Sequence, residues 1–152
     1  MKSLSNPQDK AELITRLQGV TPTSARQWGR MTPHQMLCHL SDAFRGVVGE
    51  RHISPAANFV SRTLIKCIAL YAPMPWPHGI KTRPEVDQEI GGTRPLEFAR
   101  DKGDLERLID TFARPEQNFA SYAHPAFGRM SAAQWHRWAY LHVDHHLRQF
   151  GT

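Results

Sequence analysis

Three histidines crowd the segment 141–150, and two of them are spaced to share a metal ion. His142 and His146 are four residues apart, so on a helix their side chains project from the same face and can converge on one ion. The same face carries Trp138 and Phe150, so it is the apolar side of the helix. Because an unpartnered buried polar group costs about 1–3 kcal/mol, the pattern predicts a metal that satisfies both imidazoles.

A third ligand is expected from another helix, because metal sites in helical bundles are built from inward side chains on facing helices. The natural candidate is His39, which shares a predicted helix face with the apolar residues Met36 and Ala43. Three imidazoles with an open fourth position are typical of a catalytic metal site rather than a closed structural one. The alternative is that these are ordinary core, interface or surface histidines.

Three further residues are placed to support such a site. Asp42, three residues after His39, and Gln149, three residues after His146, can hydrogen-bond the remaining imidazole nitrogens, although surface solvation or helix packing explains either equally well. His145 projects away from the centre of the apolar face, so we expect it to support the site or to be exposed rather than to bind the ion. No residue is identified as catalytic, and no general base is singled out.

Other residues with ligand chemistry lack this pattern. Cys38 follows a direction about 100° from that of His39 around the helix, so it is predicted to pack elsewhere rather than to coordinate the same ion. The remaining histidines have no partner spacing and are weaker candidates: His34, His52, His78, His124 and His136.

Periodic apolar residues predict five helices and no strands beyond short fragments, so the fold class is all-α. The helices are expected at about 7–19, 33–48, 54–72, 101–122 and 132–150, the fourth kinked or divided at Pro115. The clearest starts are those after Thr32 and Ser131, where a glutamine three residues later completes a capping box. The segment from about 79 to 100 is rich in glycine and proline and is predicted to be a long crossover connection.

Composition is typical of one globular domain spanning 1–152. The 152 residues are 40% hydrophobic and 22% charged, and the formal charge is +5. Because the 19 Lys and Arg residues are scattered among acidic ones, we expect no nucleic-acid partner. Two cysteines give no disulfide framework, and neither a secretory signal nor a membrane span is evident, so a cytoplasmic location is expected.

Longer motifs carry a resemblance to a known family. These are the helix entry at 28–40, the segment 124–128, and the terminal His-x-x-x-His followed by Arg-Gln-Phe-Gly at 142–151. Together they resemble the DinB/YfiT-like superfamily of metal-binding four-helix bundles, in its uncharacterised branch. The similarity covers about residue 17 to the C-terminus. It implies a DinB-like four-helix bundle, here with one additional helix and a long crossover loop.

The same resemblance implies that the ligands are His39, His142 and His146, and that they hold a divalent ion, Zn²⁺ or Ni²⁺. Members of the superfamily include thiol-dependent transferases and a mycothiol-dependent isomerase. The expected function is therefore that of a metal-dependent enzyme acting on a small-molecule substrate, with a low-molecular-weight thiol as a candidate. The alternative is a non-catalytic metal- or ligand-binding bundle. The apolar third helix, Phe59 to Tyr71, exceeds what a four-helix core requires and also suggests a homodimer.

Overall fold

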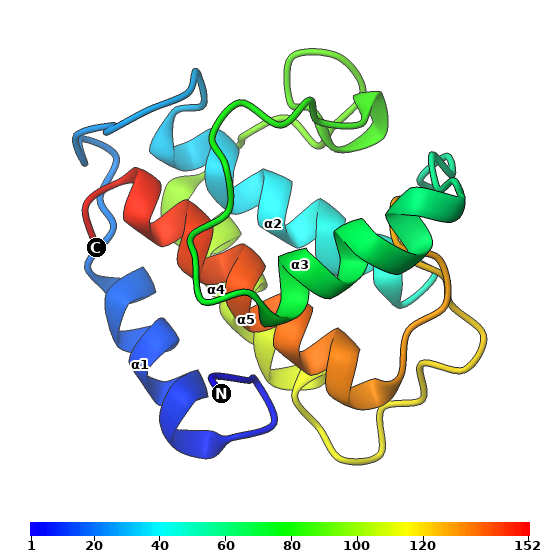
Figure 1. Cartoon of the computed structure of the whole chain (residues 1–152). Helices are drawn as coiled ribbons and strands as arrows, with labels where there is room; N and C mark the ends of the chain where they lie inside the picture. The colour runs from blue at the N-terminus through cyan, green and yellow to red at the C-terminus, as the bar shows by residue number, and fades with distance from the viewer.

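The computed structural model describes residues 1–152, and all of its regular elements are helices (Figure 1). In chain order the elements are α1 (Pro7–Gln18), α2 (Pro33–Val47), the π-helix η1 (Ser61–Ile65), α3 (Lys66–Tyr71), the 3₁₀-helix η2 (Pro84–Val86), α4 (Phe98–Phe112) and α5 (Ala132–Gln149). The only β-type pairing is a single bridge between His124 and Gly128. The prediction of an all-α fold is confirmed.

The two helices that carry the candidate ligands begin where the capping boxes place them. At the start of α2, the Thr32 hydroxyl accepts the Gln35 amide at 3.1 Å, and the Gln35 side chain accepts the Thr32 amide at 2.8 Å. Ser131 and Gln134 repeat the arrangement at the start of α5. Both reciprocal pairs satisfy backbone donors that a helix start otherwise leaves without partners.

Helix α5 runs through the middle of the molecule and contacts α1, α2 and α3, while α4 packs against α2 (Figure 1). The core between them is rich in aromatic rings. Phe44 of α2 meets Phe112 of α4 edge to face at 5.0 Å between ring centroids, and Trp135 meets Trp138 of α5 in the same way at 5.5 Å. Edge-to-face contacts of this kind add to the stabilisation from burial. Phe44 also contacts Trp138 of α5, at 6.3 Å between ring centroids, so this ring joins α2 to both α4 and α5.

The third helix starts later than predicted. A helix beginning at Ser54 was expected, but regular helical structure begins beyond Asn58, whose side chain accepts the Ser61 amide at 2.8 Å in a local cap. The segment before it is irregular, and the Ala56 amide donates to the Pro125 carbonyl at 2.8 Å, which holds this segment against a distant loop. Pairing with a distant loop therefore overrides the proline-based helix start.

The fourth helix is shifted toward the N-terminus. It begins at Phe98 rather than Asp101, because the Glu97 carboxylate caps it by accepting the amides of Ala99 and Arg100 at 2.9 and 2.6 Å. It ends at Phe112 rather than near Tyr122, so the expected second half is irregular chain. Pro115 accounts for this end, since proline cannot donate to a helical carbonyl and clashes with the preceding turn.

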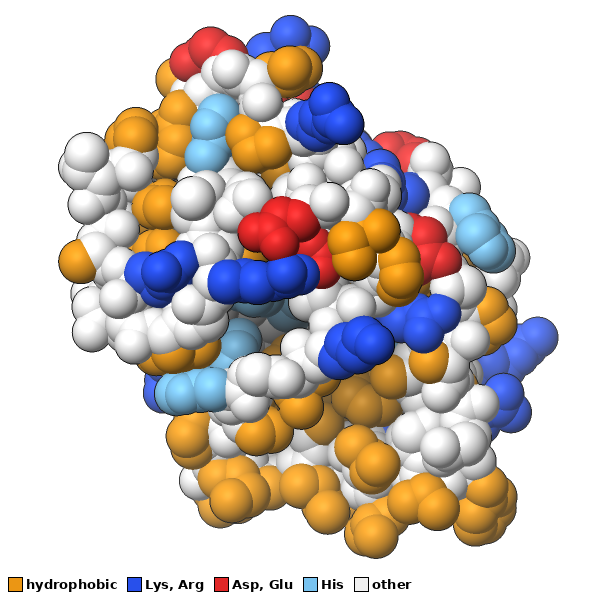
Figure 2. Space-filling model, turned by 90° about the horizontal axis from the view of Figure 1, so that it is seen from above, with side chains coloured by type: hydrophobic (Ala, Val, Ile, Leu, Met, Phe, Trp, Pro, Cys, Tyr) orange, Lys and Arg blue, Asp and Glu red, His pale blue; other side chains and the backbone are white.

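One edge of the molecule is apolar. Hydrophobic side chains gather along the lower border of the view in Figure 2. Exposed hydrophobic residues lie on η1, on α3 and just before η1. Phe59 has 82% of its surface accessible and Leu64 has 60%; the others are Val60, Ile65, Ile68 and Tyr71. Of the helices, none combines the length and the hydropathy that crossing a bilayer requires.

Candidate metal centre

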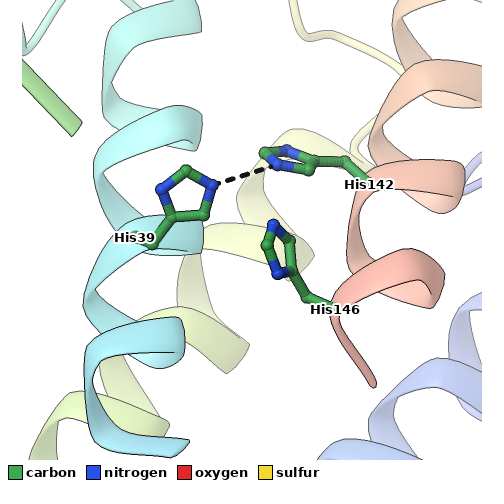
Figure 3. A group of neighbouring side chains, drawn as sticks. All are labelled: His39, His142 and His146. Carbon is green, nitrogen blue, oxygen red and sulfur yellow. Dashed lines mark hydrogen bonds between the residues drawn. The ribbon is translucent and has the colours of Figure 1, made fainter. Parts of the chain in front are cut away.

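The three predicted ligand histidines come together between α2 and α5. His39 lies in the middle of α2, and His142 and His146 lie on consecutive turns of α5 that face it. Figure 3 shows the three rings pointing toward one another across the gap between these two helices. His39 and His146 are buried and His142 is partly exposed. His142 and His146 therefore project from the apolar face of α5 toward α2, as the sequence predicts.

The ring nitrogens are close enough to share one ion. The Nε2 atoms of His39 and His142 are 3.2 Å apart, and one ring nitrogen from each of the three histidines lies within 4.8 Å of the other two. Two nitrogens bound tetrahedrally to one zinc at 2.0–2.1 Å are separated by about 3.3 Å. The spacing thus fits a shared ion with small side-chain adjustments.

Hydrogen bonds to Nδ1 leave the opposite nitrogen free on two of the rings. The Nδ1–H of His39 donates to the carbonyl of Val86 at 2.8 Å, and that of His146 donates to the side-chain oxygen of Gln149 at 2.9 Å. Nδ1 of His142 is buried without a partner. Anchoring one imidazole nitrogen in this way sets the tautomer in which Nε2 carries the lone pair that a metal needs.

Burial keeps these imidazoles neutral. It lowers the pKa of His39, and it lowers the pKa values of His142 and His146 well below the ordinary value. The neighbouring imidazoles lower the pKa values of His142 and His146 further, because a second positive charge in the cluster is unfavourable. At neutral pH the cluster therefore offers three uncharged nitrogen donors, the form that binds a metal.

Gln149 is where the sequence placed it, and it also ties the end of α5 to a distant segment. While its oxygen accepts from His146, its amide donates to the carbonyl of Trp28 at 2.9 Å. Gly29, in the left-handed region at φ +76°, allows this approach, because a Cβ at this position would lie 2.6 Å from the Gln149 nitrogen. The orientation of the His146 ring thus depends on the chain that leads into α2.

Asp42 does not bond to His39, contrary to the expectation that it orients that ring. Its buried carboxylate instead accepts the Thr93 amide at 2.7 Å and the Thr93 hydroxyl at 2.6 Å, along with donors from Gln88 and Arg51. These bonds hold the loop 84–93 against α2. Val86 lies on the same loop. Asp42 therefore helps to hold the Val86 carbonyl where it accepts the hydrogen bond from His39.

His145 lies beside the cluster at its more exposed side. Its ring is 6.0 Å from that of Trp76 and 6.1 Å from that of His78, and His78 stacks on Trp28 at 4.0 Å between ring centroids. Trp76 is also 6.0 Å from His142. An aromatic border therefore separates the cluster from solvent. No local pattern predicts this border, because three of its members, Trp28, Trp76 and His78, come from irregular segments.

An open groove of about 540 Å³ adjoins this border. Trp76 and His145 line the groove and also neighbour the histidine cluster, so they stand between the two. The rest of the lining carries both charges, including Lys2, Arg137 and Asp144. The groove is large enough for a small polar molecule.

Fold and site define an all-helical protein with a buried three-histidine cluster able to hold a metal ion. The chain belongs to the family described as "protein of unknown function (DUF1569)", whose model matches residues 77–152. That match covers half of the chain and includes His142 and His146, whereas His39 lies outside it. No curated protein and no solved structure matches the chain.

Proposed function

We propose that this protein is a DinB/YfiT-like metalloenzyme in which His39, His142 and His146 hold a divalent ion, Zn²⁺ or Ni²⁺. The observation that carries the proposal is the convergence of three neutral imidazoles on one point between α2 and α5. Imidazole nitrogen suits both ions. The group contains no fourth His, Cys, Asp or Glu, so a coordination position is left for water or substrate.

The proposed reaction is transfer or isomerisation that uses a low-molecular-weight thiol. Its support is the resemblance to thiol-dependent transferases together with the open coordination position. A bound divalent ion would lower the pKa of a thiol and so supply thiolate at neutral pH. Val86 and Gln149 hold two of the ligand rings in place, and the groove beside Trp76 offers room for the second substrate.

The test is a conjugation assay with protein loaded with Zn²⁺ or Ni²⁺. We expect the loaded protein to couple a physiological thiol to an electrophile such as a chlorinated aromatic, and H146A to abolish this activity. His52→Ala is the matched control, because His52 is exposed and outside the cluster. Activity that survives in H146A, or none with any physiological thiol, would contradict the proposed reaction.

The alternative is a bundle whose metal is structural or whose ligand is bound without turnover. It is favoured by the position of the cluster, which joins two helices that begin 99 residues apart (33 and 132). Under this alternative, chelation lowers the melting temperature strongly, while no substrate is turned over under any loading. The conjugation assay therefore distinguishes the two, and a melting experiment on the same samples shows that the metal is bound.

A further inference from the structure

A second group of ligand-type side chains lies on another face of α2. His34 and Cys38 are one helical turn apart, and Asp101 of α4 faces them. One ligand atom from each, an imidazole nitrogen, the thiol sulfur and a carboxylate oxygen, lies within 4.8 Å of the other two. Cys38 is buried, while the side chains of His34 and Asp101 are 23% and 15% exposed. Solvent therefore reaches the group from one side.

The carboxylate of Asp101 connects the other two side chains. One oxygen of Asp101 lies 2.7 Å from Nε2 of His34 and 3.7 Å from the sulfur of Cys38, which donates to it. The amide of Leu96 donates to this oxygen as well, at 3.1 Å. Three donors thus crowd one oxygen, while the sulfur and the imidazole point at the same place.

We infer that His34, Cys38 and Asp101 form a second divalent-metal site, selective for zinc-class ions and separate from the three-histidine cluster. Imidazole, thiolate and carboxylate are all established zinc ligands. When an ion binds, the Cys38 thiol gives up its proton to solvent and a metal–sulfur bond replaces the S–H bond. The ionised thiol and carboxylate then balance the two charges of the ion, and no oxidation or reduction is involved.

The distances suit such an ion. At bond lengths of about 2.0–2.3 Å, the ligand atoms of a tetrahedral zinc site lie about 3.3–3.6 Å apart. The sulfur of Cys38 is already 3.7 Å from the Asp101 oxygen. The nitrogen of His34, now 2.7 Å from that oxygen, has to withdraw by a fraction of an ångström, which a partly exposed side chain can do.

A fourth ligand has room to enter. A cavity of about 180 Å³ adjoins Cys38 and Asp101, and Arg45 and Arg100 also line it. The proposed ion would therefore carry water or a small anion toward the two arginines. Because Cys38 and His39 are consecutive on α2, they diverge by about 100°, so the two sites face different sides of this helix.

Cobalt titration tests the second site separately from the first, because a cobalt–thiolate bond produces a charge-transfer absorption in the near ultraviolet that imidazole ligands do not. We expect metal-free wild-type protein to develop this band during the titration, with one Co²⁺ bound at the thiolate, and the double variant H142A/H146A to keep it. Cys67→Ser is the matched control, because Cys67 is the other cysteine of the chain and is exposed. C67S should keep the band and Cys38→Ser should lose it.

A second variant tests the same site in case the Cys38→Ser protein does not fold. His34→Ala removes a partly exposed ligand, and we expect at least a tenfold loss of cobalt affinity measured through the thiolate band. Absence of the band in wild-type protein, or its loss in C67S, would overturn the inference without any further variant. The inference does not depend on the proposed function, since a failed conjugation assay leaves the thiolate band unaffected.

Discussion

The imidazoles of His39 and His142, which are 103 residues apart in the chain, face each other with their Nε2 atoms 3.2 Å apart. Two lone pairs at this distance repel each other, so a proton or a cation has to lie between them. The proton would come from His142, whose other nitrogen is buried and has no partner. A metal ion resolves this contact by accepting both lone pairs.

Removing one of these ligands should empty the three-histidine site. We expect protein purified without an affinity tag to lose one equivalent of metal in H142A. His145→Ala should keep the wild-type content, because that ring neighbours the cluster without being part of the ligand group. Elemental analysis measures both variants. Equal metal content in wild type and H142A would remove the basis of the site.

Metal binding should also stabilise the fold, since the cluster exists only when α2 and α5 are packed together. At a free zinc concentration 100 times the dissociation constant, the expected gain in the free energy of unfolding is about 2.7 kcal/mol. Thermal melts of chelated and zinc-loaded protein measure this gain, and H39A should lose the part of it that comes from the three-histidine cluster. A melting temperature that zinc leaves unchanged in wild type would contradict the prediction.

Gln149 should affect affinity through the ring that it holds. Replacing it by leucine removes the acceptor for Nδ1–H of His146, and losses of this kind typically cost about 10–100-fold in metal affinity. Gln149→Glu is the comparison variant: it keeps an acceptor for His146, while its carboxylate adds a negative charge and cannot donate to the Trp28 carbonyl. Competition titrations with a zinc indicator compare the two. Equal affinities for Q149L and Q149E would show that the hydrogen bond to His146 is unimportant.

Acid should destabilise the protein partly through His124. Its Nδ1 accepts the amides of Ala126 and Phe127, both at 3.1 Å, and burial lowers its pKa to about 3. In the unfolded chain the pKa returns to about 6.5, so between these values the unfolded state binds one more proton than the folded state. The free energy of unfolding therefore falls by about 1.4 kcal/mol per pH unit on acidification, from this group alone.

His124→Asn tests that contribution, because the asparagine oxygen can accept the same amides without titrating. Urea unfolding of metal-free protein between pH 6.5 and 4 should show a slope of stability against pH that is smaller by about one proton in the variant. An unchanged slope would mean that His124 takes up no extra proton on unfolding.

The apolar surface of η1 and α3 leads to a prediction about assembly. We propose that this surface, which includes Phe59 and Leu64, forms the contact of a homodimer. Light scattering should then give twice the chain mass of 17.3 kDa, and Leu64→Glu should give a monomer. Ile90→Glu is the control, since Ile90 is 70% exposed on the loop 84–93. A wild-type species of 17.3 kDa at high concentration would contradict the dimer.

The starts of α2 and α5, and the shared face of His142 and His146, were predictable because their signals are local. Thr32 and Ser131 each complete a capping box within four residues, and the positions of His142 and His146 follow from the period of one helix. Val86 could not be predicted as the partner of His39. A backbone carbonyl carries no side-chain signature, and it reaches the site because distant side chains, Asp42 and Arg51 among them, hold its loop.

Long-range contacts also explain why the group of His34, Cys38 and Asp101 and the start of the third helix were not predicted from the sequence. The four-residue spacing of His34 and Cys38 is visible in the chain, but their partner Asp101 comes from a helix whose facing side no local pattern determines. The late start of the third helix has the same origin, since Ala56 pairs with Pro125 across the molecule. In both cases the decisive contact joins segments more than 60 residues apart.

The three-histidine cluster has a topological consequence. An ion held by His39 and His142 would act as a reversible cross-link that closes a ring of about 100 residues, a ring size for which a permanent cross-link restricts the unfolded chain by about 4.7 kcal/mol. This ring contains α3, α4 and the long crossover loop. The concentration of available metal would thereby determine how readily most of the chain unfolds. The lifetime of the protein would depend on that concentration.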